Sequence, residues 1–186
     1  MKKILLIMMV AMLCAATANA QIKFGAKAGV NLSTLTDADD AELKFGFHVG
    51  GFAEFTLSDR IALQPELLYS TQGADAEGDN SLSLGYINVP VLLKVNIVEG
   101  LSAEVGPQVG FLLSSKAKSG VVSVSIKDYT KSLDVSAVIG LSYTFAEKFV
   151  VSARYGLGFT TVYKQELVND AKPKNSVMQV SFGYKF

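Results

Sequence analysis

The stretch LDVSAVIGLSYTFAEKFVVSARYGLGFT (133–160) contains the pattern that decides the fold. Apolar residues occupy alternate positions over 133–145 and again over 149–159, and the positions between them are mostly small or polar. Alternation with a period of two is typical of β-strands. The three residues 146–148 separate the two runs, which is a common length for a tight hairpin loop. The stretch therefore predicts two long antiparallel strands.

The same alternation continues through almost the whole chain from residue 22. It predicts eight strands, at about 22–33, 44–57, 61–70, 82–97, 101–111, 133–145, 149–160 and 178–186. Three connections are tight, at 58–60, 98–100 and 146–148, and four are long and polar, near 34–43, 73–81, 114–131 and 164–174. Short and long connections alternate along the chain. This arrangement predicts an all-β fold, an eight-stranded antiparallel up-and-down barrel, as one domain over residues 21–186.

The distribution of side chains indicates which face of the barrel is outside. Most of the aromatic residues lie on the apolar face, whereas most of the glycines and the charged strand residues lie on the other. A narrow eight-stranded lumen has room for small and paired polar groups but not for a shell of Phe and Tyr. Strands of about ten residues, tilted by about 45°, match the thickness of a bilayer. We therefore expect a transmembrane barrel with an apolar exterior; a soluble barrel of the lipocalin type is the alternative.

The first twenty residues, MKKILLIMMVAMLCAATANA, have the three-part layout of a secretory signal peptide. Lys2 and Lys3 precede an apolar run, and the segment ends in the small residues around Ala20. We expect cleavage after Ala20, export, and residence in the bacterial outer membrane. Lipidation is not expected, because the only Cys, Cys14, follows Leu13 rather than a small residue.

Composition excludes several classes of function. The 186 residues contain 17 Lys+Arg and 17 Asp+Glu, with one His and one Cys. A nucleic-acid-binding protein would need a basic stripe, and a disulfide scaffold or a cysteine-built zinc site would need more Cys. We expect no nucleic-acid partner, no cofactor and no metal centre.

A set of charged residues falls on the predicted luminal face. The set comprises Lys27, Glu54, Glu66, Lys94, Glu104 and Arg154. A hairpin that pairs Ile97 with Leu101 would place Lys94 directly opposite Glu104. Unpaired charges would be costly in a poorly hydrated interior, so we expect an ion network that closes the lumen. A hydrated lumen that serves as a narrow transport pathway is the alternative.

His48 is the only candidate for a general base. The register of its hairpin would place it opposite Ser70, with Glu66 about four residues deeper, so a lipid-modifying membrane enzyme is a weaker alternative. No nucleophile elbow, zinc motif or phosphate loop is present. A lone luminal histidine in a polar network is the favoured interpretation, and we expect no catalytic residues and no enzymatic activity.

The predicted long loops differ in charge. The acidic run at 37–42 could gather a divalent cation, but it lacks the spacing of an EF-hand, so a solvated loop is favoured. The first two long loops are acidic and the last two are rich in Lys. This polarised rim is a candidate docking surface for lipid phosphates or a protein partner.

The apolar phase also changes within one strand. Leu82, Leu84 and Tyr86 are apolar in even positions, and the residues from Ile87 onward are apolar in odd positions. A one-residue slip beside a proline is typical of a β-bulge. We therefore predict a bulge between Tyr86 and Pro90.

Four segments resemble the recurring motifs of the PorT-like "porin family" of outer-membrane barrel domains. They are FGAKAGVNLSTL (24–35), LQPELLYSTQG (63–73), YINVPVLLK (86–94) and VSFGYKF (180–186). The resemblance covers the whole mature chain and implies an outer-membrane barrel, most members of which have no assigned activity. One branch of the family is associated with protein secretion.

The last of these segments resembles the final aromatic strand that the barrel assembly machinery reads. That resemblance implies an assembly signal at Phe182, Tyr184 and Phe186. Taken together, we expect a structural or interaction module in contact with outer-membrane lipid, with a side-chain-filled lumen and a possible protein partner at the extracellular loops. A narrow channel, a secretion component and a lipid-modifying enzyme are the alternatives.

Overall fold

The computed structural model describes residues 22–36, 43–76, 80–119, 122–125, 131–161 and 174–186. The predicted signal peptide lies outside these residues. The strands are β1 (Ile22–Thr36), β2 (Lys44–Thr56), β3 (Ile61–Ala76), β4 (Asn80–Val98), β5 (Leu101–Ser119), β6 (Val122–Ser125), β7 (Leu133–Phe145), β8 (Phe149–Thr161) and β9 (Lys174–Lys185). Within the described part of the chain, no helix is long and apolar enough to cross a membrane.

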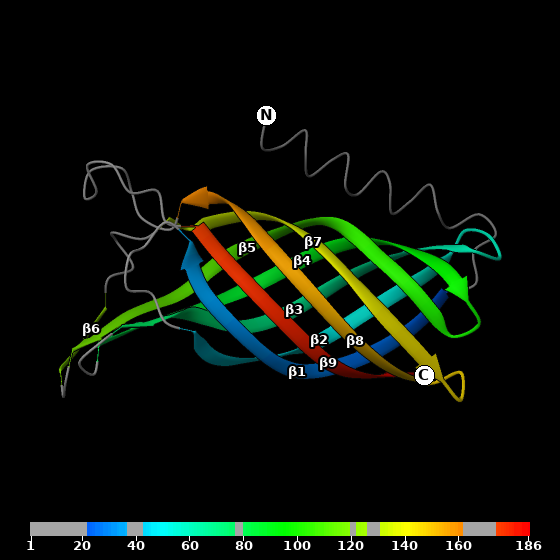
Figure 1. Cartoon of the computed structure of the whole chain (residues 1–186), viewed down its shortest axis with the longest axis horizontal. Helices are drawn as coiled ribbons and strands as arrows, with labels where there is room; N and C mark the ends of the chain where they lie inside the picture. Colours follow the sequence, from blue (N-terminus) through cyan, green and yellow to red (C-terminus); the bar gives the residue numbers. More distant parts are fainter. Residues whose placement is uncertain (1–21, 37–42, 77–79, 120–121, 126–130, 162–173) are drawn as a thin grey trace.

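Eight long strands close into an antiparallel barrel, as the alternation predicts. Each strand pairs with the next along the chain, β1 pairs with β9, and the pairing of β4 with β5 completes the ring. The short strand β6 pairs only with the end of β5. Figure 1 shows the tilted strands, with the tight turns and the C-terminus at one end of the barrel. In outer-membrane barrels the short turns face the periplasm.

The hairpin registers follow the sequence closely. His48 pairs with Ser70 across β2 and β3, and Lys94 pairs with Glu104 across β4 and β5, both as predicted. The β4–β5 turn differs by one residue, because Val98 pairs with Leu101 and leaves a two-residue turn. Gly100 lies in that turn with φ of 79°, a conformation that glycine adopts without steric cost.

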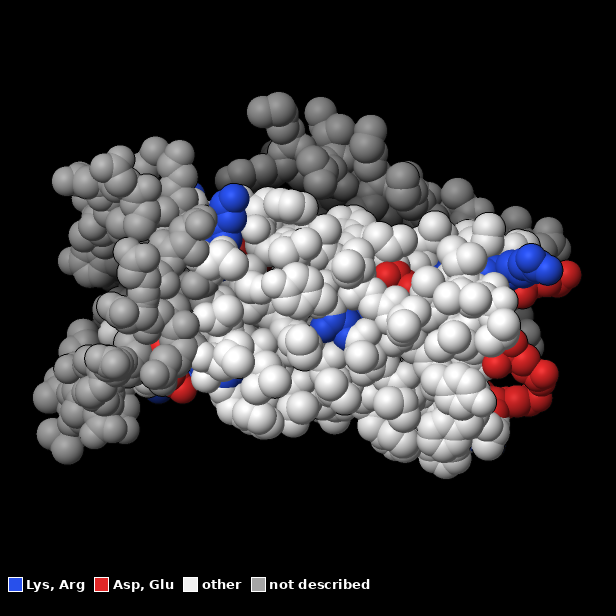
Figure 2. All heavy atoms as spheres, viewed as in Figure 1, with Lys and Arg blue, Asp and Glu red and all other residues white. Residues whose placement is uncertain are grey.

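The exterior of the barrel is apolar. Each of the eight long strands carries large hydrophobic side chains that are exposed on the outside of the barrel. Examples that are at least half exposed are Phe24, Phe47, Leu67, Leu141 and Phe182. Figure 2 shows that few charged side chains interrupt the middle of the visible face, and that charges gather at the tight-turn end. An outward apolar band is what a bilayer requires of a barrel, so the predicted assignment of faces is confirmed.

The strands extend further at the loop end than the sequence suggested. β3 continues to Ala76 and β4 begins at Asn80, inside the loop expected at 73–81. β5 continues to Ser119, and β6 lies within the loop expected at 114–131. These strands form an extension of the sheet beyond the β5–β7 ladder, which ends at the pair Phe111 and Leu133. The polar composition of these segments predicts loops, whereas backbone pairing continues through the polar residues and extends the ladders.

The predicted bulge between Tyr86 and Pro90 is wrong. The β3–β4 ladder runs without a shift through this region, and the even residues of β4 face the lumen on both sides of it. The apolar even residues are therefore inside, where Ala74, Leu82, Leu84, Tyr86 and Leu112 form a buried cluster. A change in the chemistry of the lumen, and not a slip of the backbone, explains the change of phase.

A register shift does occur nearby, on the neighbouring strand. Gly85 pairs with Ser114 and Tyr86 with Leu112, so Leu113 is an extra residue on β5. Leu112 is buried and Leu113 is exposed. The bulge lets Leu112 join the luminal cluster while the strand continues into the extension.

Candidate functional site

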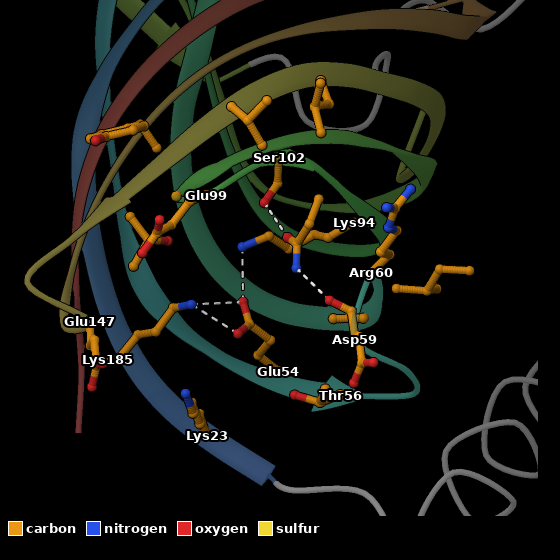
Figure 3. A pocket seen from close by; sticks show the side chains of 18 of the residues that line it. Lys23, Glu54, Thr56, Asp59, Arg60, Lys94, Glu99, Ser102, Glu147 and Lys185 are labelled. Atoms are coloured by element: carbon orange, nitrogen blue, oxygen red, sulfur yellow. Dashed lines mark hydrogen bonds and ion pairs between the residues drawn. The ribbon is translucent and has the colours of Figure 1, made fainter.

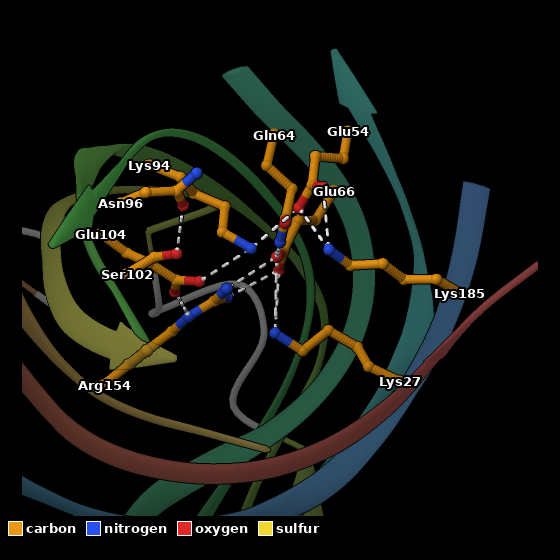
Figure 4. A network of polar contacts seen from close by, with 10 residues as sticks. All are labelled: Lys27, Glu54, Gln64, Glu66, Lys94, Asn96, Ser102, Glu104, Arg154 and Lys185. Carbon is orange, nitrogen blue, oxygen red and sulfur yellow. Dashed lines mark hydrogen bonds and ion pairs between the residues drawn. The ribbon is translucent and has the colours of Figure 1, made fainter. Parts of the chain in front are cut away.

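Seven charged side chains meet in the lumen near its tight-turn half (Figure 4). They are buried, and they comprise Lys27, Lys94, Arg154 and Lys185 with Glu54, Glu66 and Glu104. They come from β1, β2, β3, β4, β5, β8 and β9, so the cluster ties together nearly the whole circumference. We call this set the luminal ion network.

Arg154 is the centre of one half of the luminal ion network. Its Nη1 and Nη2 donate to the two carboxylate oxygens of Glu66 at 2.8 and 2.9 Å. Its Nε donates to Glu104 Oε2 at 2.5 Å. Lys27 approaches Glu66 at 3.4 Å, and the side-chain amide of Gln64 donates to Glu66 at 2.5 Å. Planar guanidinium groups suit this bidentate geometry, and such saturation is what makes buried charge tolerable.

Glu54 is the centre of the other half. Lys94 Nζ donates to its Oε2 at 2.8 Å, and Lys185 Nζ donates to its Oε1 and Oε2 at 2.8 and 3.0 Å. Lys94 also lies 3.7 Å from Glu104 Oε1, which links the two halves. Four cations against three carboxylates leave the network with one excess positive charge.

The structure brings together all six luminal residues that the sequence singled out, but it redistributes their partners. Lys94 is opposite Glu104 in register, yet its shorter contact is to Glu54, two strands away. Lys185 was not included in the predicted set. The sequence does indicate that Lys185 faces the lumen, because it shares the polar face of the last strand with Gln179 and Ser181. Its partner could not be inferred, because the closure of β9 on β1 sets the height of Lys185 in the lumen.

His48 lies further from the tight-turn end, and both ring nitrogens are hydrogen-bonded. Asn31 Nδ2 donates to the carbonyls of Phe47 and Thr71, which turns its Oδ1 toward His48 Nδ1 at 2.7 Å. In the neutral ring Nδ1 therefore donates to Asn31, and Nε2 accepts from the Ser181 hydroxyl at 2.7 Å. This is a satisfied luminal histidine.

His48 does not contact Ser70 or Glu66, the two residues that the sequence suggested as its catalytic partners. Ser70 bonds to Asn31 rather than to His48, and Glu66 is occupied by Arg154 and Lys27. The backbone around the ring is also tight, since a Cβ added at Gly29 would lie 2.6 Å from His48 Cε1 and 2.1 Å from the Val180 carbonyl oxygen. The hydroxyl within hydrogen-bond reach of the imidazole is that of Ser181, and both side chains are buried in the lumen.

The lumen is closed at two levels. The luminal ion network crosses the lumen on the tight-turn side, and a cluster from β3, β4 and β5 packs inside the barrel nearer the loop end; its members are Ala74, Leu82, Leu84, Tyr86 and Leu112. A luminal cavity of about 10 Å³, which is room for about one water molecule, is lined by Gln108, Asp134 and Asn175 among others. The buried side chains of the described residues thus obstruct the lumen at both levels.

Below the luminal ion network the barrel opens into a vestibule at the tight-turn end (Figure 3). The cavity has a volume of about 950 Å³, and Glu54, Lys94 and Lys185 belong to its wall. Lys23 and residues of the three tight turns complete the wall.

No group of three or more His, Cys, Asp or Glu side chains in the described ranges is placed to hold a metal ion. The acidic run at 37–42, considered for a divalent cation, lies outside those ranges. The Lys-containing loop predicted at 164–174 also lies outside them, apart from Lys174.

The predicted assembly signal lies in an aromatic cluster on the outer surface at the tight-turn end. Phe182, Tyr184 and Phe186 of the C-terminal segment contact one another or the neighbouring rings of Phe145 and Phe149, with centroid separations of 5.4–6.5 Å. The Phe186 backbone N–H donates to the Phe24 carbonyl at 2.8 Å. Aromatic side chains at this level are typical of a membrane interface.

Comparison with known proteins agrees with this architecture. Residues 16–164 match the family model described as "Outer membrane protein beta-barrel domain". The chain belongs to this family of outer-membrane β-barrel proteins. No match was found among curated proteins.

Two solved structures share the fold. The attachment invasion locus protein Ail of Yersinia pestis is 18% identical, with a TM-score of 0.53, and the match covers 88% of this chain and 98% of that one. Neisserial surface protein A is 13% identical, with a TM-score of 0.58, and the match covers 90% and 99% of the two chains. Both similarities concern the barrel fold alone.

Proposed function

We propose that this protein is a non-conducting outer-membrane barrel that serves as a structural or interaction module. The observation that carries the proposal is the double closure of the lumen, by the luminal ion network and by the apolar cluster around Leu84 and Tyr86. A transport pathway would need a hydrated route past both levels, and the luminal cavity lined by Gln108, Asp134 and Asn175 has room for about one water molecule.

Conductance of the purified full-length barrel in planar lipid bilayers tests this proposal. We expect no large stable current from the wild type. The variant Glu66→Ala/Glu104→Ala/Arg154→Ala/Tyr86→Ala removes side chains from both levels, and it is expected to conduct if it folds. A large stable current from the wild type would contradict the proposal and favour the transport alternative.

The working surface of the module is proposed to be its loop end. The extension formed by the ends of β3, β4 and β5 together with β6 carries the sheet beyond the β5–β7 ladder, and a protein partner could contact it there. Photo-crosslinking from position 116, where Lys116 is exposed, tests this in the native membrane. A crosslinked species that is absent when the same probe replaces Glu147 in a tight turn would support an extracellular partner.

We infer further that the chain is a member of the PorT-like "porin family" of outer-membrane barrel domains. The four segments that carry this resemblance each supply one residue to the luminal ion network: Lys27, Glu66, Lys94 and Lys185. The recurring motifs thus coincide with the positions that close the lumen. A secretion role is tested by deleting the gene and comparing the proteins in the medium; unchanged secretion would favour the structural module.

We propose that the protein has no enzymatic activity of its own, because His48 and the Ser181 hydroxyl bonded to it are both buried in the lumen, where no substrate from the lipid or the solvent reaches them. Lipid profiles of membranes that carry the wild type or His48→Ala test this. A lipid product that disappears in His48→Ala membranes, at equal barrel levels, would support the enzyme alternative. We likewise propose delivery by the export pathway and insertion by the assembly machinery; the level of barrel in the outer membrane after deletion of Phe186 tests the insertion.

A further inference from the structure

We propose that the vestibule at the tight-turn end is a binding site for a small organic oxyanion, a solute bearing a phosphate or carboxylate group, which enters from the periplasmic side. The site is the cavity of about 950 Å³ whose inner wall carries Lys23, Lys94 and Lys185 (Figure 3). This volume is within the range of cavities that hold whole small-molecule ligands.

The first argument is the balance of charge at the inner wall. Lys23 on β1 lies directly opposite Glu54 on β2 in register, and Lys94 and Lys185 both donate to that carboxylate. Two ammonium groups therefore contact this carboxylate, and a third lysine, Lys23, stands opposite it on the neighbouring strand. Glu104 adds little here, because it lies 2.5 Å from Arg154 Nε but 3.7 Å from Lys94 Nζ.

The second argument is the state of Lys23. Both oxygens of Glu54 are taken by the other two lysines, and Lys23 makes no ion pair with any described residue. Lys23 is also near enough to Lys185 for their charges to repel one another. An oxyanion beside Lys23 and Lys185 would accept hydrogen bonds from both and relieve this repulsion. The ammonium group of lysine suits phosphate and carboxylate alike, because it acts as a point charge with three donors.

The third argument is the contrast between the inner wall and the mouth. Each of the three tight turns carries one exposed acidic residue at the cavity, namely Asp59, Glu99 and Glu147, and Arg60 is the one exposed cation of these turns in the cavity wall, so the turns contribute a net negative charge. Negative charge at the mouth disfavours long polyanions, whereas positive charge deeper inside favours a compact anionic group. The site therefore suits a small solute whose anionic end reaches the lysines. It is independent of whether the lumen conducts, since a binding equilibrium requires no passage along the axis.

Isothermal titration calorimetry of the full-length barrel in lipid nanodiscs tests the site with two probes, inorganic phosphate and succinate. We expect saturable one-to-one binding of at least one probe, and the tighter of the two distinguishes a phosphate ligand from a carboxylate ligand. Lys23→Gln should weaken binding by about tenfold, in line with the loss of one charge-assisted hydrogen bond. Lys148→Gln is the matched control, because Lys148 lies in a tight turn at the same end but is not part of the cavity wall.

A labelling measurement on the wild type does not depend on the folding of a variant. Acetylation of lysines, read by mass spectrometry, should slow at Lys23 when the bound probe is present and stay unchanged at Lys148. Absence of saturable binding for both probes would overturn the proposal. Equal weakening by Lys23→Gln and Lys148→Gln would also overturn it, because a general surface potential would then explain the binding.

Discussion

Arg154 on β8 forms a bidentate ion pair with Glu66 on β3 across the lumen, in which both terminal guanidinium nitrogens donate to the two carboxylate oxygens. The two strands are not neighbours in the barrel, and 88 residues separate the pair in the sequence. The same guanidinium also holds Glu104 on β5. The Arg154 side chain therefore links its own strand, β8, to β3 and β5.

Removal of this guanidinium should be costly. Arg154→Met leaves Glu66 without its bidentate partner and Glu104 without its nearest cation, so we expect the free energy of unfolding to fall by about 3–5 kcal/mol. Arg154→Lys keeps the charge but loses the fork, and it should cost less. Urea unfolding in lipid vesicles measures both. Addition of Glu66→Gln and Glu104→Gln to Arg154→Met should recover part of the loss; a wild-type unfolding free energy in Arg154→Met alone would show that water, and not Arg154, satisfies these carboxylates.

Lys94 should couple more strongly to Glu54 than to its cross-strand neighbour Glu104. The contacts are 2.8 Å and 3.7 Å respectively, and both pairs are buried. In double-mutant cycles with alanine we expect a coupling energy of about 1–3 kcal/mol for Lys94 with Glu54, and a smaller value for Lys94 with Glu104. The opposite order would mean that register neighbours, rather than the diagonal contact, dominate the network.

Leu141 should tolerate a charge poorly, because half of its surface is exposed on the apolar exterior of β7. We expect Leu141→Arg to lower the unfolding free energy by about 2–4 kcal/mol if the residue lies near the bilayer midplane. Glu147→Arg, in the exposed turn that follows the same strand, is the control and should change stability by about 0.5 kcal/mol or less. Reversible unfolding in lipid vesicles compares the two. Equal stability of Leu141→Arg and wild type would mean that this face does not contact lipid.

Phe186 should matter for assembly. Deletion of Phe186 removes a ring that packs on Tyr184 at 5.7 Å and the backbone bond to Phe24, together with the proposed recognition signal. We expect less heat-modifiable barrel in the outer membrane of cells that express the deletion.

Phe159→Ala provides the control for that experiment. Phe159 is also an exposed aromatic residue on the exterior, at 62% exposure, but it lies toward the loop end of β8. Its barrel level should stay near that of the wild type. Equal loss in both variants would indicate a general requirement for interfacial aromatic residues and not a C-terminal signal.

Local pattern was sufficient for the strands and the hairpins. Alternation with period two and the tight turns predicted the pairs His48 with Ser70 and Lys94 with Glu104, because a short loop leaves almost no choice of register between two adjacent strands. The same reasoning failed at Tyr86. There, the apolar even residues were assigned to the outside, since sequence alternation carries no information on whether the lumen at that height is polar or apolar.

The sequence by itself therefore determined the eight-stranded barrel, its apolar exterior and the identity of six buried charges. Only the tertiary structure decided which charges meet. The height of each residue in the lumen depends on the tilt and stagger that close the ring, which accumulate over all eight ladders. For this reason Arg154 reaches Glu66, Lys94 prefers Glu54, and Lys185 enters the network through the β9–β1 closure.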